Sequence, residues 1–247
     1  MLSAFAVLAA CVAANDPSQP LGKPDLKQAA RINTQLGVGY LREGQISVAL
    51  DKLKLAVKQD PDYAEAHSAL AVVSAQRGDY PMAESEYRRA LSLDSSNPDL
   101  KNNFGAFLCE RGKYDEGQRY LLQAAENRDY RTPEAAWTNA GVCAQTAGEA
   151  PTAEKDFRQA LQINPSFPDA LSQMTRISFD RQDYLRAQAF ADRYRKVGRP
   201  TAQMLWLSSQ IERKLGNGEA ANDFAAQLIQ QFPASAEAAQ ASKLVTP

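Results

Sequence analysis

Small residues recur along the chain in pairs whose members lie twelve positions apart, and the pairs themselves repeat with a fixed period. Successive pairs are 34, 34, 36, 34 and 34 residues apart. They are Gly37/Ala49, Ala71/Ala83, Gly105/Gly117, Gly141/Ala153, Thr175/Ala187 and Ser209/Ala221. The sequence around them is rich in helix-forming residues and has no strand-like run of β-branched residues. The pattern therefore predicts an all-α protein made of repeated helical units.

Each repeated unit also carries signals for a turn and for the end of a helix. A glycine lies between the two small residues in five of the six units, and Gln182 replaces it in the fifth. Glycine readily adopts the left-handed conformation that ends a helix. Pro61, Pro165 and Pro233 follow later in their units, where a second helix must stop because proline lacks an amide proton.

These spacings resemble the tetratricopeptide repeat, in which each unit is a pair of antiparallel helices. The resemblance covers residues 30 to about 235 and implies a right-handed superhelix of about six units, because one helix pair cannot bury its own apolar face. The six expected units span residues 30–63, 64–97, 98–131, 134–167, 168–201 and 202–235. Residues 236–247 are expected to form a capping helix and tail. The two additional residues near Arg131 and Thr132 mark the expected place of a bend.

A different kind of segment precedes the repeats. Residues 4–10 are apolar but too few to span a bilayer, and they end at Leu8-Ala9-Ala10-Cys11. This resembles the lipobox of bacterial lipoproteins, so residues 1–10 are expected to be a signal peptide and Cys11 to be lipidated. No Lys or Arg precedes Cys11, which indicates that the start is clipped or lies upstream; the alternative is a signal-type segment with an incidental cysteine.

The residues after Cys11 suggest where the protein resides. Val12 stands where an Asp usually retains such lipoproteins in the inner membrane, so the outer membrane is expected. Residues 11–29 are rich in proline and polar residues and predict a lipid-anchored tether.

Charge and composition narrow the possible functions. The chain has 28 Lys+Arg against 29 Asp+Glu, so it has no overall positive field for nucleic acid. A single histidine, His67, excludes a multi-histidine metal site, and its repeat position favours a structural role. No P-loop, GxSxG, HExxH or Cys-x-x-Cys motif is present. We therefore predict no enzyme activity, no cofactor, no metal and no small-molecule substrate.

Cys109 and Cys143 lie on the first helices of adjacent units. Such helices run side by side, so the two thiols could form a disulfide in an oxidising compartment. Two buried apolar cysteines are the alternative.

Without a catalytic motif, we predict that the chain binds a protein in the groove of the superhelix. This groove is expected to be lined by the fifth, ninth and twelfth positions of each first helix. The candidate binding residues are Thr34, Val38, Leu41, Ser68, Val72, Ala75, Asn102, Ala106 and Trp206. For the aliphatic members, packing against the next unit is the alternative.

Two stretches carry a closer resemblance, LGVGYLREGQISVALDKLKLAVKQDPDYAEAH and NNFGAFLCERGKYDEGQRYLLQAA. The Lys and Asn clamp of chaperone-docking repeats is absent, because Thr34 and Val38 occupy its positions. Together with the lipobox, these stretches resemble the pilotins of type IV pilus biogenesis, the PilF/PilW lipoproteins.

This resemblance implies a non-enzymatic lipoprotein on the periplasmic face of the outer membrane. It would bind the type IV pilus secretin and assist its localisation and multimerisation, and hence pilus assembly and twitching motility. The alternative is a repeat lipoprotein that serves as a scaffold for barrel assembly or cell-wall synthesis.

Overall fold

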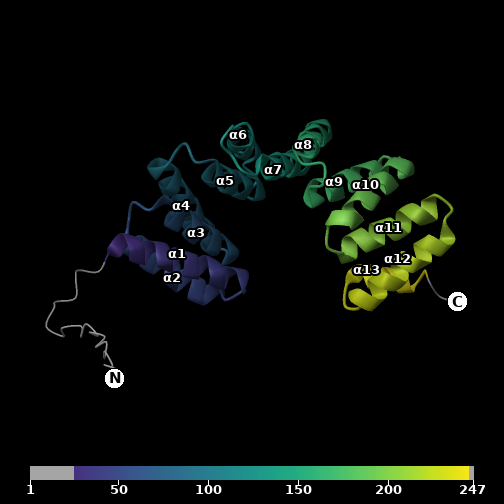
Figure 1. Cartoon of the computed structure of the whole chain (residues 1–247), viewed down its shortest axis with the longest axis horizontal. Coiled ribbons are helices and arrows are strands. Elements are labelled where there is room, and N and C mark those ends of the chain that lie inside the picture. The colour runs from purple at the N-terminus through teal and green to yellow at the C-terminus, as the bar shows by residue number, and fades with distance from the viewer. Residues whose placement is uncertain (1–24, 245–247) are drawn as a thin grey trace, which may run out of the picture.

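A computed structural model describes residues 25–244, which form thirteen α-helices arranged as an open arch (Figure 1). The helices are α1 (Leu26–Arg42), α2 (Ile46–Gln59), α3 (Ala64–Gln76), α4 (Tyr80–Leu93), α5 (Pro98–Glu110), α6 (Tyr114–Ala125), α7 (Pro133–Thr146), α8 (Ala150–Ile163), α9 (Pro168–Asp180), α10 (Tyr184–Val197), α11 (Ala202–Lys214), α12 (Gly218–Gln231) and α13 (Ala236–Ser242). No strand occurs among these residues. The predicted all-α class is confirmed.

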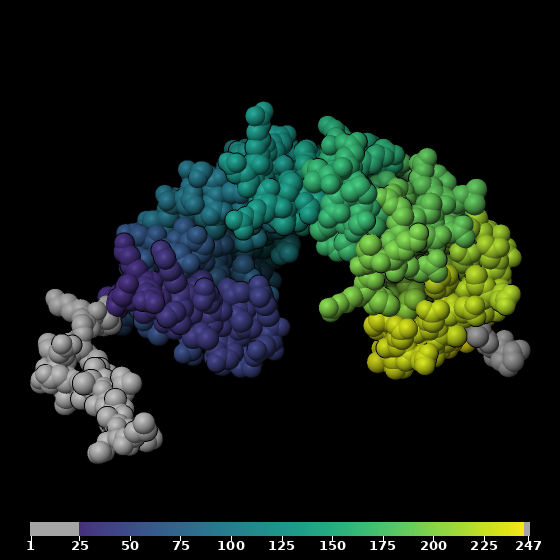
Figure 2. Space-filling view, in the orientation of Figure 1, coloured from purple at the N-terminus to yellow at the C-terminus, as the bar shows by residue number. Residues whose placement is uncertain are grey.

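Consecutive helices pair as hairpins, and each hairpin packs on the next along the chain. The first helices of the central units, α5 and α7, lie on the inner side of the arch, and their partners α6 and α8 lie on the outer side (Figure 1). The space-filling view shows a wide hollow between the two ends of the arch (Figure 2). Each unit contacts mainly its neighbours, so the stability of one unit depends on the units beside it.

The turn between the two helices of each unit has the same backbone conformation throughout. Five of these turns contain a glycine with φ between 74° and 86°, and Gln182 in the turn of the fifth unit adopts φ 62°. Glycine tolerates this left-handed region, whereas a residue with a Cβ is strained there. The fold therefore imposes the turn even where the sequence lacks its preferred residue.

The paired small residues lie where the two helices of one unit approach closely. A Cβ on Gly105 would lie 2.9 Å from the carbonyl oxygen of Gly117, so only glycine fits at this crossing. In the last unit the Ser209 hydroxyl donates a hydrogen bond of 2.7 Å to the carbonyl of Ala221. The paired small residues of the sequence therefore mark where the two helices of each unit cross.

The ends of the stack differ from each other. The side chain of Asp25 accepts a hydrogen bond from the amide of Gln28 and caps α1 at Leu26. Residues 26–29, which the sequence assigned to the tether, are therefore helical. At the other end α13 begins at Ala236, and its Ala238 packs against α11 and α12.

The two inserted residues belong to a loop, residues 126–132, between α6 and α7. Tyr130 in this loop is buried with Ala125 and Ala136. The loop therefore packs against both adjoining units.

Candidate functional site: a groove on the inner face

A groove of about 510 Å³ lies between α3, α5 and α7, the first helices of the second, third and fourth units. Four of the residues predicted from the sequence line it, namely Val72, Ala75, Asn102 and Ala106. The rest of its wall is made by Gln76, Tyr80, Tyr87, Asn103, Phe107, Glu110, Arg111 and Asn139.

The floor of this groove is aromatic and tightly packed. Tyr87 is buried, and its ring centroid lies 5.5 Å from that of Phe104 and 5.3 Å from that of Phe107. Burial raises the pKa of the Tyr87 hydroxyl far above its usual value, so this group stays uncharged. The floor therefore presents a rigid, neutral surface to a bound segment.

The rim of the groove carries amides, the cation of Arg111 and the exposed carboxylate of Glu110. The Asn139 side-chain amide donates a hydrogen bond of 2.9 Å to the Asn102 side-chain carbonyl, which links α7 to α5. Asn103 beside them is exposed. The Arg111 guanidinium carbon lies 3.8 Å from the ring centroid of Tyr80, at one end of the groove. Because amides both donate and accept, this rim can pair with the backbone of a peptide segment.

Two of the expected groove residues are buried in the core, so the prediction is wrong at these positions. Thr34 is buried, and its hydroxyl donates to the carbonyl of Ala30 in the preceding turn. Ser68 is buried as well. A partner in the groove cannot contact either side chain.

Three further expected residues are half-buried by packing. Val38 and Leu41 pack against a cluster that includes Leu50 and Leu70, so they join the first unit to the second. Trp206 packs in the last units against a cluster that includes Phe224. For Val38 and Leu41, the packing alternative describes the structure better than an open groove.

The sequence analysis missed the groove residues that lie outside the fifth, ninth and twelfth helix positions. Asn103 and Asn139 are 36 residues apart and occupy the same position of consecutive units. The recurrence of asparagine at this position, once the two inserted residues are counted, is a signal that could have identified both residues. Tyr80 and Arg111 face each other beside helix ends, and no sequence spacing relates them.

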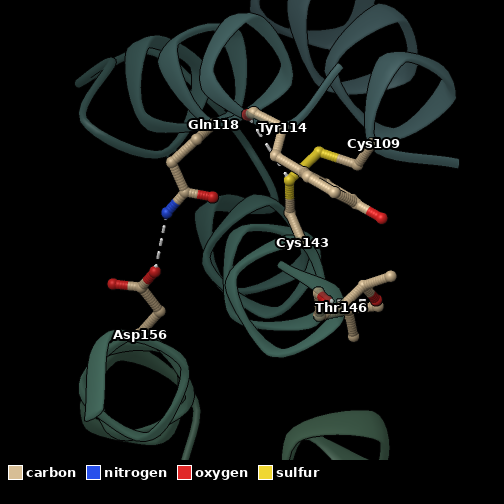
Figure 3. The surroundings of a disulfide bond; sticks show 7 residues. Cys109, Tyr114, Gln118, Cys143, Thr146 and Asp156 are labelled. Atoms are coloured by element: carbon tan, nitrogen blue, oxygen red, sulfur yellow. Dashed lines mark hydrogen bonds between the residues drawn. A yellow bond between two sulfur atoms is a disulfide. The ribbon is translucent and has the colours of Figure 1, made fainter. Parts of the chain in front are cut away.

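A disulfide joins Cys109 of α5 to Cys143 of α7, with the two Cα atoms 5.4 Å apart (Figure 3). Ala106, one turn before Cys109, packs against the same cluster and also lines the groove. The sulfur of Cys109 leaves no room for a Cβ at Gly117. The cross-link therefore lies at one edge of the groove and fixes α5 relative to α7.

The outer helices of the same two units are joined by a polar contact. The Gln118 side-chain amide of α6 donates a hydrogen bond of 3.0 Å to the Asp156 carboxylate of α8 (Figure 3). Asp156 is buried, and burial raises the pKa of its carboxyl despite this hydrogen bond. The junction between the third and fourth units is thus held on both sides of the stack.

His67 is buried, and both of its ring nitrogens face acceptors. Nδ1 lies 2.6 Å from a carboxylate oxygen of Glu86, and Nε2 lies 2.9 Å from the carbonyl oxygen of Pro61. Burial alone would lower the pKa of His67, but the hydrogen bonds to Glu86 and Pro61 outweigh it and raise the pKa. The histidine thus links α3 to α4 and to the preceding loop, as a structural residue does.

Residues 25–244 contain no group of three or more His, Cys, Asp or Glu side chains that could hold a metal ion. None of their helices is long and apolar enough to cross a bilayer. Cys11, the proposed lipidation site, lies outside the described residues.

Known proteins share this architecture. The tetratricopeptide repeat family matches residues 34–98 and 108–168. Type IV pilus assembly protein PilF of Pseudomonas aeruginosa is 29% identical over 230 residues, which cover 93% of this chain and 91% of PilF. A solved structure of Pseudomonas aeruginosa PilF matches with a TM-score of 0.76 and 29% identity, over 89% of this chain and 99% of that one.

A crystal structure of PilW, described as a widely conserved type IV pilus biogenesis factor, has a TM-score of 0.75 and 29% identity over the same shares. The Cut9 and Hcn1 assembly, at 17% identity and a TM-score of 0.73, shares the fold. This chain therefore belongs to the tetratricopeptide repeat family and is homologous to the type IV pilus proteins PilF and PilW.

Proposed function

We propose that this protein is a pilotin, a non-enzymatic lipoprotein that binds the type IV pilus secretin and assists its localisation and multimerisation in the outer membrane. The observation that carries the proposal is the homology to PilF and PilW over almost the whole chain, which supports a role in pilus assembly. Cys11 would carry the lipid that holds the protein on the periplasmic face of that membrane.

The disulfide supports an envelope location. Disulfides persist in the oxidising periplasm and are rare in the reducing cytosol. Cys109 and Cys143 form such a bond between two units. A protein exported by the predicted signal peptide, residues 1–10, would enter this oxidising compartment.

The inner groove supplies a site for a segment of the partner. Its aromatic floor and its amide rim suit a peptide that buries apolar side chains and pairs its backbone with Asn102, Asn103 and Asn139. The binding residues are then Val72 and Ala75 together with the lining of α5. Superhelical repeat arrays commonly bind partners on such concave surfaces.

Capture of partners from outer-membrane extract tests this proposal. The wild-type protein is expected to recover the secretin, identified by mass spectrometry. Asn103→Arg fills the groove with a bulky cation from an exposed position and should weaken capture roughly tenfold, or by about 1.4 kcal/mol. Gln162→Arg adds the same positive charge at an exposed position of α8, outside the groove, and should leave capture unchanged.

Two results would contradict the proposal. Recovery of a barrel-assembly component or a cell-wall synthase in place of the secretin would favour the alternative scaffold function. Equal secretin capture by Asn103→Arg and wild type would show that the partner binds outside the groove.

A second experiment tests the lipid anchor. Cys11→Ala should release the protein from the outer-membrane fraction of cells that lack the secretin, since lipidation is the proposed source of attachment.

A further inference from the structure

The first helix of the stack has an apolar face without a partner among residues 25–244. Ile32 and Leu36 of α1 are 49% and 43% exposed. The residues 34 positions later, Ala66 and Leu70, are 0% and 2% exposed, and Leu70 packs against the first unit. The repeat therefore places Ile32 and Leu36 where a preceding unit would pack, and none of the thirteen described helices covers them.

The charge of α1 differs from that of the rest of the chain. Residues 26–59, which form α1 and α2, carry six Lys and Arg and two Asp and Glu, and Asp60 and Asp62 follow in the loop to α3. The cations of α1 are Lys27, Arg31 and Arg42, and α1 contains no Asp or Glu. None of the six cations forms an ion pair within residues 25–244. The helix α1 thus presents positive charge without an ion pair together with exposed aliphatic side chains.

We propose that this end of the stack, formed by α1, lies on an anionic membrane surface. Helices that bind at the bilayer interface combine Lys and Arg with apolar side chains that enter the headgroup region. In α1 these roles fall to Lys27 and Arg31, and to Ile32 and Leu36. A protein partner would need a matching acidic and apolar surface, whereas anionic phospholipid supplies both properties at once.

The proposed lipid anchor would keep this face near the membrane, and in this respect the inference rests on the proposed function. Fourteen residues separate Cys11 from Leu26. As the tether that the sequence predicts, a segment of that length would have an end-to-end distance of roughly 20 Å, which would keep α1 close to the headgroups. A weak surface interaction is then sufficient, because the tether raises its effective concentration.

Vesicle binding tests the proposal without the lipid anchor or the secretin. Residues 12–247 retain all thirteen described helices and lack Cys11. This protein should sediment with vesicles of phosphatidylglycerol and phosphatidylethanolamine, and high salt should release it. Vesicles of phosphatidylcholine alone should not bind it.

Variants identify the surface that is responsible. Lys27→Glu with Arg31→Glu should weaken binding to anionic vesicles roughly tenfold or more. Ile32→Glu with Leu36→Glu should do the same, and both positions are exposed, so circular dichroism should stay as in wild type. Leu185→Glu is the matched control, because Leu185 is 72% exposed on α10, in the fifth unit.

Equal binding of wild type to neutral and anionic vesicles, or no binding to either, would overturn the proposal. Loss of binding in Leu185→Glu to the same extent as in the α1 variants would also overturn it. These outcomes leave the proposed secretin binding untouched, since partner capture measures that activity separately.

Discussion

Removal of the bond between Cys109 and Cys143 should destabilise the array by an amount that its loop length sets. The bond joins residues 34 positions apart. A cross-link over a loop of this length removes chain entropy from the unfolded state worth about 4 kcal/mol at 25 °C. Both cysteines are buried where two units pack, so this junction and the neighbouring units should unfold together. Loss of the bond should therefore destabilise those units as well.

Urea denaturation followed by circular dichroism measures this loss on residues 12–247. For a slope of about 2–3 kcal/mol/M, the loss corresponds to a midpoint lower by roughly 1–2 M. The oxidised protein, the reduced protein and the Cys109→Ala/Cys143→Ala variant should be compared. Reduction and substitution should lower the midpoint by similar amounts, because both remove the same covalent constraint.

Unchanged midpoints after complete reduction would refute this reasoning and mean that the unfolded chain gains no freedom from loss of the bond. A decrease in the double variant alone, with the reduced protein as stable as the oxidised one, would attribute the effect to lost packing of the sulfur atoms. Titration of free thiols before each denaturation series establishes the redox state.

Three further predictions concern single residues. Since the pKa of His67 is raised from 6.5, its contribution to stability should be complete below pH 6.5 and be lost as pH rises through the folded-state pKa. Denaturation over a pH series should reveal this loss, and His67→Gln should lack it. A Cβ at Gly141 would lie 2.6–2.9 Å from three ring atoms of Phe157, so Gly141→Ala should cost about 1–3 kcal/mol, which the melting temperature reports. Gln182→Gly relieves a left-handed backbone with φ 62° and should stabilise the protein by about 0.5–1 kcal/mol; a lower melting temperature would contradict this account.

The fold was predictable because the same geometric constraint recurs at every helix crossing. Gly105 and Gly117 are small because their backbones nearly touch, and such a constraint appears directly in the sequence. The conformation of the turn was predictable even at Gln182, because five other units carry glycine there. The helical start at Leu26 was missed because Asp25 caps α1 ahead of the first repeat unit.

The site was only partly predictable, because accessibility depends on how neighbouring units cover a helix. The repeat pattern predicts that positions five and nine of a first helix both face the groove. In α3, however, Ser68 is buried, and Val72 lines the groove. The partnership of Arg111 with Tyr80 joins two units through their turns, and no periodic pattern records it. The disulfide remained one of two alternatives, since side-by-side helices permit a bond but do not require it.

The difference between the covered and the uncovered end of the stack should set the order in which the protein unfolds. α13 covers the last unit, whereas the packing face of α1 has no partner within residues 25–244. In a linear array, opening is easiest where a unit has one neighbour, so amide hydrogen exchange should be fastest in α1 and α2. Unfolding that spreads from α1 should stop at the third unit, because the disulfide holds α5 against α7. The first two units can therefore open and close while the central units stay folded.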